Sequence, residues 1–168
     1  MLDLNVQWQN IKVVNIQKND VDDIKKWLYK QSEFAEESVY PIEVSELYDR
    51  FLEYYISENE FFSKIQFENK TIGILKGRVE FKNPSEAWIW CLMIDYEYRG
   101  KGIGSRVIDE VNSYLNREYN IEYFYTTVMR DSFRTIEFLK KNGYKIKRVS
   151  KNYYDINGKQ MDMLILKK

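Results

Sequence analysis

Apolar positions along the chain change between helix-like and strand-like spacing. Residues 11–16 are β-rich and predict a strand, whereas apolar residues at three- and four-residue spacing predict a helix with Val21, Ile24, Trp27 and Leu28 on one side and a second helix near residues 43–56. Further strands are predicted over 61–67, 71–81, 87–94, 121–128, 144–156 and 161–166, and further helices from residue 103 and from about residue 133 to Gly143. About seven strands and four helices in this order indicate an α/β (α+β) fold.

Residues 99–105, Arg-Gly-Lys-Gly-Ile-Gly-Ser, stand between an apolar run and the helix that starts at Ile103. The preceding run, 87–94, is apolar at both odd and even positions and predicts a central strand covered on both faces. Three glycines in five positions leave backbone N–H groups uncovered at a helix start, where four of them have no acceptor within the helix. The stretch therefore predicts an anion-binding turn.

Two better-known phosphate-binding motifs do not fit this stretch. A P-loop requires Gly-Lys-Ser or Gly-Lys-Thr, but Lys101 is followed by Gly102. A dinucleotide-binding fingerprint requires G-x-G-x-x-G in a parallel βαβ unit, whereas the glycines here are spaced by two and two and follow predicted hairpins.

The pattern Arg/Gln-x-x-Gly-x-Gly/Ala after an apolar strand is met by Arg99, Gly102 and Gly104, and the chain resembles the GCN5-related N-acetyltransferases. The predicted order of elements covers essentially the full length of that fold. The resemblance implies one domain over residues 1–168, with a mixed, mostly antiparallel, splayed sheet. It also implies an acetyl-CoA-dependent transfer of an acetyl group to a primary amine.

The resemblance also implies where coenzyme A would lie. Backbone groups at Leu92, Met93 and Ile94 would pair with the pantetheine arm, and the N–H groups of the loop would bind the pyrophosphate. Ser132, before a helix that resembles the second family motif, belongs to the same implied site. The implied loop residues are Arg99, Gly100, Lys101, Gly102, Ile103, Gly104 and Ser105.

The composition restricts the chemistry. The 168 residues contain no histidine and one cysteine, Cys91, which excludes His-based nucleophilic systems, an internal disulfide and a Cys-cluster metal site. No metal is therefore expected. We expect the amine to attack directly in a ternary complex, because Cys91 has no histidine to activate it.

The resemblance assigns the catalytic groups less directly than the coenzyme A site. By resemblance, the backbone N–H of Ile94 would stabilise the oxyanion. The family's usual tyrosine acid, asparagine and strand-end base correspond here to Leu139, Ser132 and Thr127, which depart from the common pattern. Glu86 is the remaining candidate base and would act through water. It is separated from Leu92 and Ile94 by an even number of residues along the predicted strand, so all three are expected on the same face.

Charge is balanced overall, with 26 basic and 26 acidic residues, so no nucleic-acid partner is expected. The helix near 43–56 is nevertheless acidic, and the resemblance implies that the acceptor pocket lies beside it. A cationic acceptor is therefore expected: a polyamine, an aminoglycoside-like amine or a peptide amine. Its candidate substrate-binding residues are Glu43, Glu46, Asp49 and Glu53. The rival prediction is a non-catalytic acyl-CoA-binding or sensing module of the same fold.

No apolar run approaches the length of a membrane span, and the start of the chain lacks the features of a signal peptide. A cytoplasmic protein without a membrane partner is expected. Aromatic residues make up 16% of the chain, which is compatible with a homodimer surface.

Overall fold

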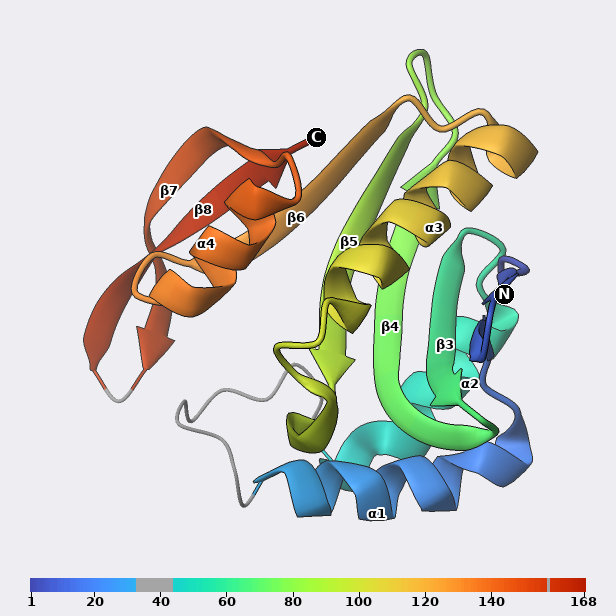
Figure 1. The fold of residues 1–168 in the computed structure, drawn as a ribbon. Coiled ribbons are helices and arrows are strands. Elements are labelled where there is room, and N and C mark those ends of the chain that lie inside the picture. Colours follow the sequence, from blue (N-terminus) through green and yellow to red (C-terminus); the bar gives the residue numbers. More distant parts are fainter. Residues whose placement is uncertain (33–43, 157) are drawn as a thin grey trace. The chain divides into compact units, whose positions relative to one another are not determined.

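The structure is a computed structural model, which describes residues 1–32, 44–156 and 158–168. Within them the chain forms eight strands and four α-helices (Figure 1). They group into two compact units, Met1–Arg78 with Trp90–Val107 and Val79–Ile89 with Ile108–Lys168. The strand order is β1-β2-β3-β4-β5-β6-β8-β7, and the β5–β6 pair is parallel. The prediction of a mostly antiparallel sheet is confirmed, with one strand more than expected; the single domain stays a prediction.

The first unit is built on consecutive antiparallel strands. These are β1 (Asn5–Trp8), β2 (Ile11–Asn15), β3 (Glu60–Phe67) and β4 (Lys70–Glu80), followed by the end of β5 (Glu86–Ile94). Glu68 and Asn69 join β3 to β4 with φ of 49° and 66°, the two positive angles of a type I′ turn. The predicted hairpin is confirmed. Sequence analysis missed β1, because its four residues include two polar amides that hide the strand pattern.

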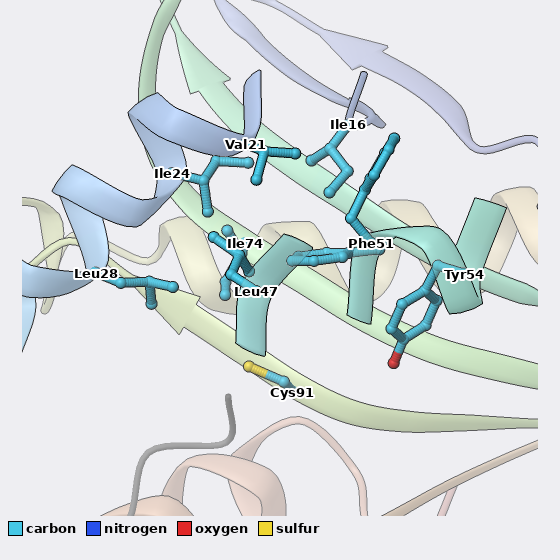
Figure 2. Close-up of a cluster of buried hydrophobic side chains, with 10 residues drawn as sticks. Ile16, Val21, Ile24, Leu28, Leu47, Phe51, Tyr54, Ile74 and Cys91 are labelled. Atoms are coloured by element: carbon cyan, nitrogen blue, oxygen red, sulfur yellow. The ribbon is translucent and has the colours of Figure 1, made fainter. Parts of the chain in front are cut away.

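Helices α1 (Val21–Ser32) and α2 (Leu47–Ile56) belong to this unit, each preceded by a 3₁₀ turn, η1 (Lys18–Asp20) and η2 (Val44–Glu46). Their buried residues meet β3, β4 and β5 in one apolar cluster, and Figure 2 shows Leu28, Leu47 and Phe51 around Ile74 of β4. Cys91 of β5 lies in the same cluster. The helix predicted near 43–56 is confirmed from Val44 onward.

The apolar face of α2 is wider than the part that the cluster buries. Leu47, Phe51 and Tyr54 are buried, whereas four other apolar side chains of the helix are exposed. The exposed ones are Tyr48, Leu52, Tyr55 and Ile56. Spacing alone therefore identified the helix but not which part of its apolar face is covered.

The second unit contains the start of β5 and the C-terminal part of the chain. Its strands are β6 (Tyr123–Met129), β7 (Lys145–Ile156) and β8 (Lys159–Lys167), and its helices are α3 (Ile103–Tyr119), from Ile108 on, and α4 (Phe133–Lys141). Gly143, with φ of 86°, follows α4 as predicted, whereas Phe133 at the start of that helix is 72% exposed. Asn157, which precedes Gly158, lies outside the described residues.

The burial pattern along β5 corrects one expectation about this strand. Ala87, Ile89 and Cys91 are buried in strict alternation, but the next buried residue is Ile94 rather than residue 93. Leu92 and Met93 are both half-buried, so burial stops alternating in the last part of the strand. Trp90 is 40% exposed, so the strand is not covered on both faces along its whole length.

None of the helices in the described parts of the chain is long and apolar enough to cross a membrane.

Candidate functional site

The glycine loop of the first unit connects the end of β5 to α3. After β5 come a 3₁₀ turn, η3 (Tyr96–Tyr98), and then Arg99 to Gly102. Gly100 and Gly102 have φ of 73° and 78°, which side chains with a Cβ rarely adopt. A Cβ added at either glycine would meet nothing within 4 Å. The glycines are thus required by the backbone conformation, and the space in front of the loop is open.

The first turn of α3 contains N–H groups without an acceptor in the helix. The first α-helical hydrogen bond runs from the N–H of Arg106 to the carbonyl of Gly102, at 3.1 Å. The N–H groups of Ile103, Gly104 and Ser105 precede this bond and have no acceptor within the helix. Together with the helix dipole they favour an anion, so the predicted turn has the geometry of a phosphate site.

A polar network on α1 fixes the start of the loop. The Asp95 carboxylate, 3% exposed, accepts the indole N–H of Trp27 at 3.1 Å and the backbone N–H of Glu97 at 3.0 Å. The side-chain oxygen of Gln31 accepts the N–H of Tyr96 at 3.0 Å. Sequence analysis missed all three supporting side chains. An aspartate directly after an apolar strand was a usable signal for Asp95, but nothing in the local pattern marked Trp27 or Gln31 as its partners.

Three basic side chains lie at the loop, and one of them, that of Arg99, is bonded to the backbone at its start. The Nε of Arg99 donates to the carbonyl of Ile94 at 2.8 Å, so Arg99 folds back on the end of β5. Lys101 and Lys70 place their ammonium groups 5.3 and 5.5 Å from the ring centroid of Tyr98. Lys70 is a neighbour of the loop that the sequence did not suggest, because it comes from the start of β4.

The backbone at the end of β5 has a defined orientation. The N–H of Asp95 donates to the carbonyl of Ile72 on β4 at 2.7 Å. Because successive residues of a strand point their backbone groups to opposite edges, Ile94 and Leu92 face away from β4, and Met93 faces β4. The parallel ladder with β6 ends at the Ile89–Thr126 pair. Residues 90–94 lie beyond that ladder and, among the described residues, are not paired with β6.

The other proposed cofactor residue, Ser132, belongs to the second unit. It is 5% exposed and is the N-cap of α4, where its carbonyl accepts the N–H of Ile136 at 3.0 Å. Leu139, at the position of the usual tyrosine acid, is buried in the same helix, and Thr127 is half-buried on β6.

Glu86, the candidate base, forms an ion pair in the second unit. Its carboxylate is 2.8 Å from the Lys82 ammonium, which also lies 2.9 Å from Glu80. The hydrogen bond that the Lys82 ammonium donates to Glu86 is the largest cause of the raised pKa of Lys82. Glu86 thus takes part in a clamp at the β4–β5 turn, and its side chain is 14% exposed.

The acidic residues of η2 and α2 are partly neutralised. Arg50 lies 2.9 Å from Glu53 and 3.4 Å from Glu46, and Glu53 is the main cause of the raised Arg50 pKa. Asp49 is exposed on the same helix. Glu43 lies outside the described residues. Three of the four residues predicted to bind the amine substrate therefore lie near one another, and Arg50 reduces the negative charge of this group.

Cys91 is unsuited to act as a nucleophile. Burial raises the pKa of its thiol to about 12, so the thiolate is a minor form at neutral pH. The nearby Lys76 ammonium opposes this shift only in part. In the described residues no group of three or more acidic or cysteine side chains is arranged to hold a metal ion.

Comparison with known proteins identifies a family and a set of similar folds. A family model described as an acetyltransferase (GNAT) domain matches residues 13–165. N-alpha-acetyltransferase 50 of Danio rerio is 23% identical over 136 residues, covering 80% of this chain and 79% of that protein.

Two solved structures are similar in fold. The ribosomal L7/L12 alpha-N-protein acetyltransferase RimL, in complex with coenzyme A, has a TM-score of 0.83 at 15% identity, over 98% of this chain and 97% of that one. A spermidine N-acetyltransferase SpeG chimera from Vibrio cholerae and hSSAT has a TM-score of 0.75 at 15% identity, over 95% and 94%.

Proposed function

We propose that this chain, which belongs to the GNAT acetyltransferase family, transfers the acetyl group of acetyl-CoA directly to a primary amine, most favourably the α-amine of a protein N-terminus. The observation that carries the proposal is the glycine loop, where two positive-φ glycines with open space around them lead into the first N–H groups of α3. A cytoplasmic location is part of the same proposal.

The residues of the loop fit coenzyme A. The pyrophosphate would lie against the N–H groups of Ile103, Gly104 and Ser105, because a phosphate satisfies unpaired helix N–H groups and the dipole together. Lys101 and Lys70 supply positive charge beside them. The pantetheine amides would pair with the edge of β5 at Leu92 and Ile94, whose backbone groups face away from β4. When bound, the thioester supplies the activated acetyl group.

The transfer has three needs: a donor to the oxyanion, removal of a proton from the amine, and a proton for the CoA thiolate that leaves when the C–S bond breaks, which water supplies. The N–H of Ile94 would donate to the acyl oxygen as negative charge develops on it. The attacking amine, with an ordinary pKa near that of lysine at about 10, must first lose a proton. Glu86 would accept that proton through water. Ser132 stays a cofactor residue that the family resemblance implies.

A protein N-terminus is favoured over a polyamine on two grounds. The relative and the RimL structure are both named as enzymes of alpha-amino groups. In addition, a polyamine carries several ammonium groups and requires several unpaired carboxylates, whereas Arg50 already pairs with Glu46 and Glu53.

The decisive experiment measures thiol release from acetyl-CoA with a panel of N-terminal peptides, polyamines and aminoglycosides, on the wild type and on Gly102→Asp. The substitution places a carboxylate at the expected pyrophosphate position and should weaken CoA binding by at least about a hundredfold, from lost contacts and like-charge repulsion together.

Gly158→Asp is the matched control, because Gly158 has φ of 79° and equally open space around it. It carries the same backbone strain and should bind CoA as the wild type does. CoA binding without turnover on any amine would favour the non-catalytic rival, and CoA binding that survives in Gly102→Asp would contradict the assignment of the loop.

A further inference from the structure

The C-terminal part of the second unit is strongly basic, although the whole chain is neutral. Residues 140–168 contain nine lysines and arginines and two aspartates. They form the end of α4, β7 and β8, which Figure 1 traces to the C-terminus. Since the overall charge is zero, the rest of the chain is acidic by the same amount, so this segment stands out locally. None of the catalytic roles proposed above uses it.

The bases gather around a hollow in this unit. Its volume is about 360 Å³, and its lining includes Lys145, Lys147, Lys167 and Lys168, with Tyr123 and Ile146 as apolar walls. No acidic residue is among the described residues that line it. The volume lies at the lower end of the range of small-ligand sites, enough for one or two phosphate groups with part of a nucleoside.

Two of the four lysines are already partly satisfied. The Lys168 ammonium lies 2.9 Å from Asp109, and that of Lys167 lies 3.2 Å from the ring centroid of Tyr123. Lys145 and Lys147 are exposed and have no carboxylate within ion-pair distance in the described part of the chain. Four cations with one carboxylate neighbour leave a positive field that an anion would neutralise.

The chemistry of the lining favours phosphate. Lysine ammonium groups act as mobile point charges that suit phosphate oxygens. The Tyr123 ring lies under the Lys167 ammonium and helps to hold that charge at the hollow. The bases also continue past the hollow along β7, where Arg148 and Lys151 are exposed and Tyr153 is 59% exposed.

We propose that this hollow is a second phosphate-binding site, additional to the glycine loop, which takes the phosphate groups either of a free nucleotide or of a single-stranded RNA backbone.

The test uses the full chain and a fluorescently labelled single-stranded RNA oligonucleotide, followed by anisotropy over a range of salt concentrations. Lys145→Glu/Lys147→Glu should weaken binding by at least about tenfold, and the slope of log K against log salt should fall by about 1.4, at roughly 0.7 for each lost phosphate contact. Inorganic tripolyphosphate and AMP, added as competitors, separate the two sources. Displacement of the RNA by either at low concentration indicates a nucleotide site, and resistance to both indicates an RNA site.

Two controls make the result decisive. Lys18→Glu/Lys26→Glu changes the charge equally at exposed residues of the first unit and should leave binding unchanged. Gly102→Asp should also leave it unchanged, because the glycine loop is a different site. The proposal is overturned if neither RNA nor tripolyphosphate nor AMP binds. It is also overturned if Lys18→Glu/Lys26→Glu loses as much affinity as Lys145→Glu/Lys147→Glu. It is also overturned if binding is lost in Gly102→Asp but kept in Lys145→Glu/Lys147→Glu; the lysines would then serve to protect β7, an edge strand.

Discussion

The indole N–H of Trp27 donates to the buried carboxylate of Asp95 at 3.1 Å, and this bond ties α1 to the start of the glycine loop. Asp95 in turn accepts the N–H of Glu97 and donates its own N–H to Ile72 on β4. One residue therefore fixes the turn to both a helix and a strand. The loop itself consists largely of glycines and exposed bases, so its shape depends on this anchoring.

Replacing Trp27 with phenylalanine tests the anchor. The ring is largely kept, but the donor to a buried carboxylate is lost, which should lower the free energy of unfolding by about 2 kcal/mol. The KM for acetyl-CoA should rise several-fold, because the start of the loop loses a support. Urea unfolding and steady-state kinetics measure the two effects. Tyr29→Phe, at a 54% exposed residue of the same helix, is the control and should change neither. Equal stability of Trp27→Phe and wild type would show that the bond is unimportant.

Gly73→Ala tests the close approach of β4 and β5. A Cβ at residue 73 would collide with the carbonyl oxygen of Met93 and lie 3.1 and 3.2 Å from the Cδ1 atoms of Ile65 and Ile94. The strands must separate to admit it, at a cost of about 1–3 kcal/mol. Ile94 should shift with them, so calorimetry should show weaker CoA binding. Gly158→Ala also loses stability, through its positive φ, but should keep the affinity of the wild type. Unchanged CoA affinity in Gly73→Ala would argue against the edge of β5 as the pantetheine contact.

Local chemistry explains why much of the site was predictable. The glycines at 100 and 102 of the predicted turn have positive φ angles, and α3 starts at Ile103 as expected. Both features depend on residues within one short stretch. The bond between Trp27 and Asp95 joins residues 68 positions apart, and no local pattern contains that information.

The remaining errors also have physical causes. The strand predicted to be covered on both faces leaves Trp90 40% exposed, because an apolar pattern does not show which neighbours cover it. Spacing identified α2, yet it gave no measure of how much of the apolar face is covered. The partial neutralisation of the acidic residues by Arg50 follows from side-chain geometry, which the charge count did not include.

The proposed base is tested by comparing Glu86→Gln with Glu80→Gln. Lys82 pairs with both carboxylates at nearly equal distances, 2.8 and 2.9 Å, so each variant removes one member of the same clamp. If Glu86 accepts the proton of the amine, its variant should lose about a hundredfold or more in kcat and the acidic limb of the pH profile. The Glu80 variant should keep both. Similar small losses in the two variants would leave Glu86 with a structural role only.

The raised pKa of Cys91 predicts a loss of stability at alkaline pH. The thiol ionises at an ordinary pKa of 9.0 in the unfolded chain, whereas burial raises its pKa to about 12 in the folded one. Between these values the unfolded chain releases a proton that the folded chain retains, so stability is present below pH 9.0 and is lost as the pH rises above it, by up to about 1.4 kcal/mol for each pH unit.

Cys91→Ala removes this ionisation. The variant should be less stable than the wild type near neutral pH by about 1 kcal/mol, because a buried sulfur is lost, and the gap should close or reverse near about pH 10. Urea unfolding at the two pH values measures the difference, in which contributions from the buried tyrosines cancel. Because the proposed transfer is direct, the variant should also keep the kcat of the wild type. A gap that stays constant with pH would show that Cys91 ionises normally, and an acetyl group on Cys91, detected by mass spectrometry during turnover, would contradict direct transfer.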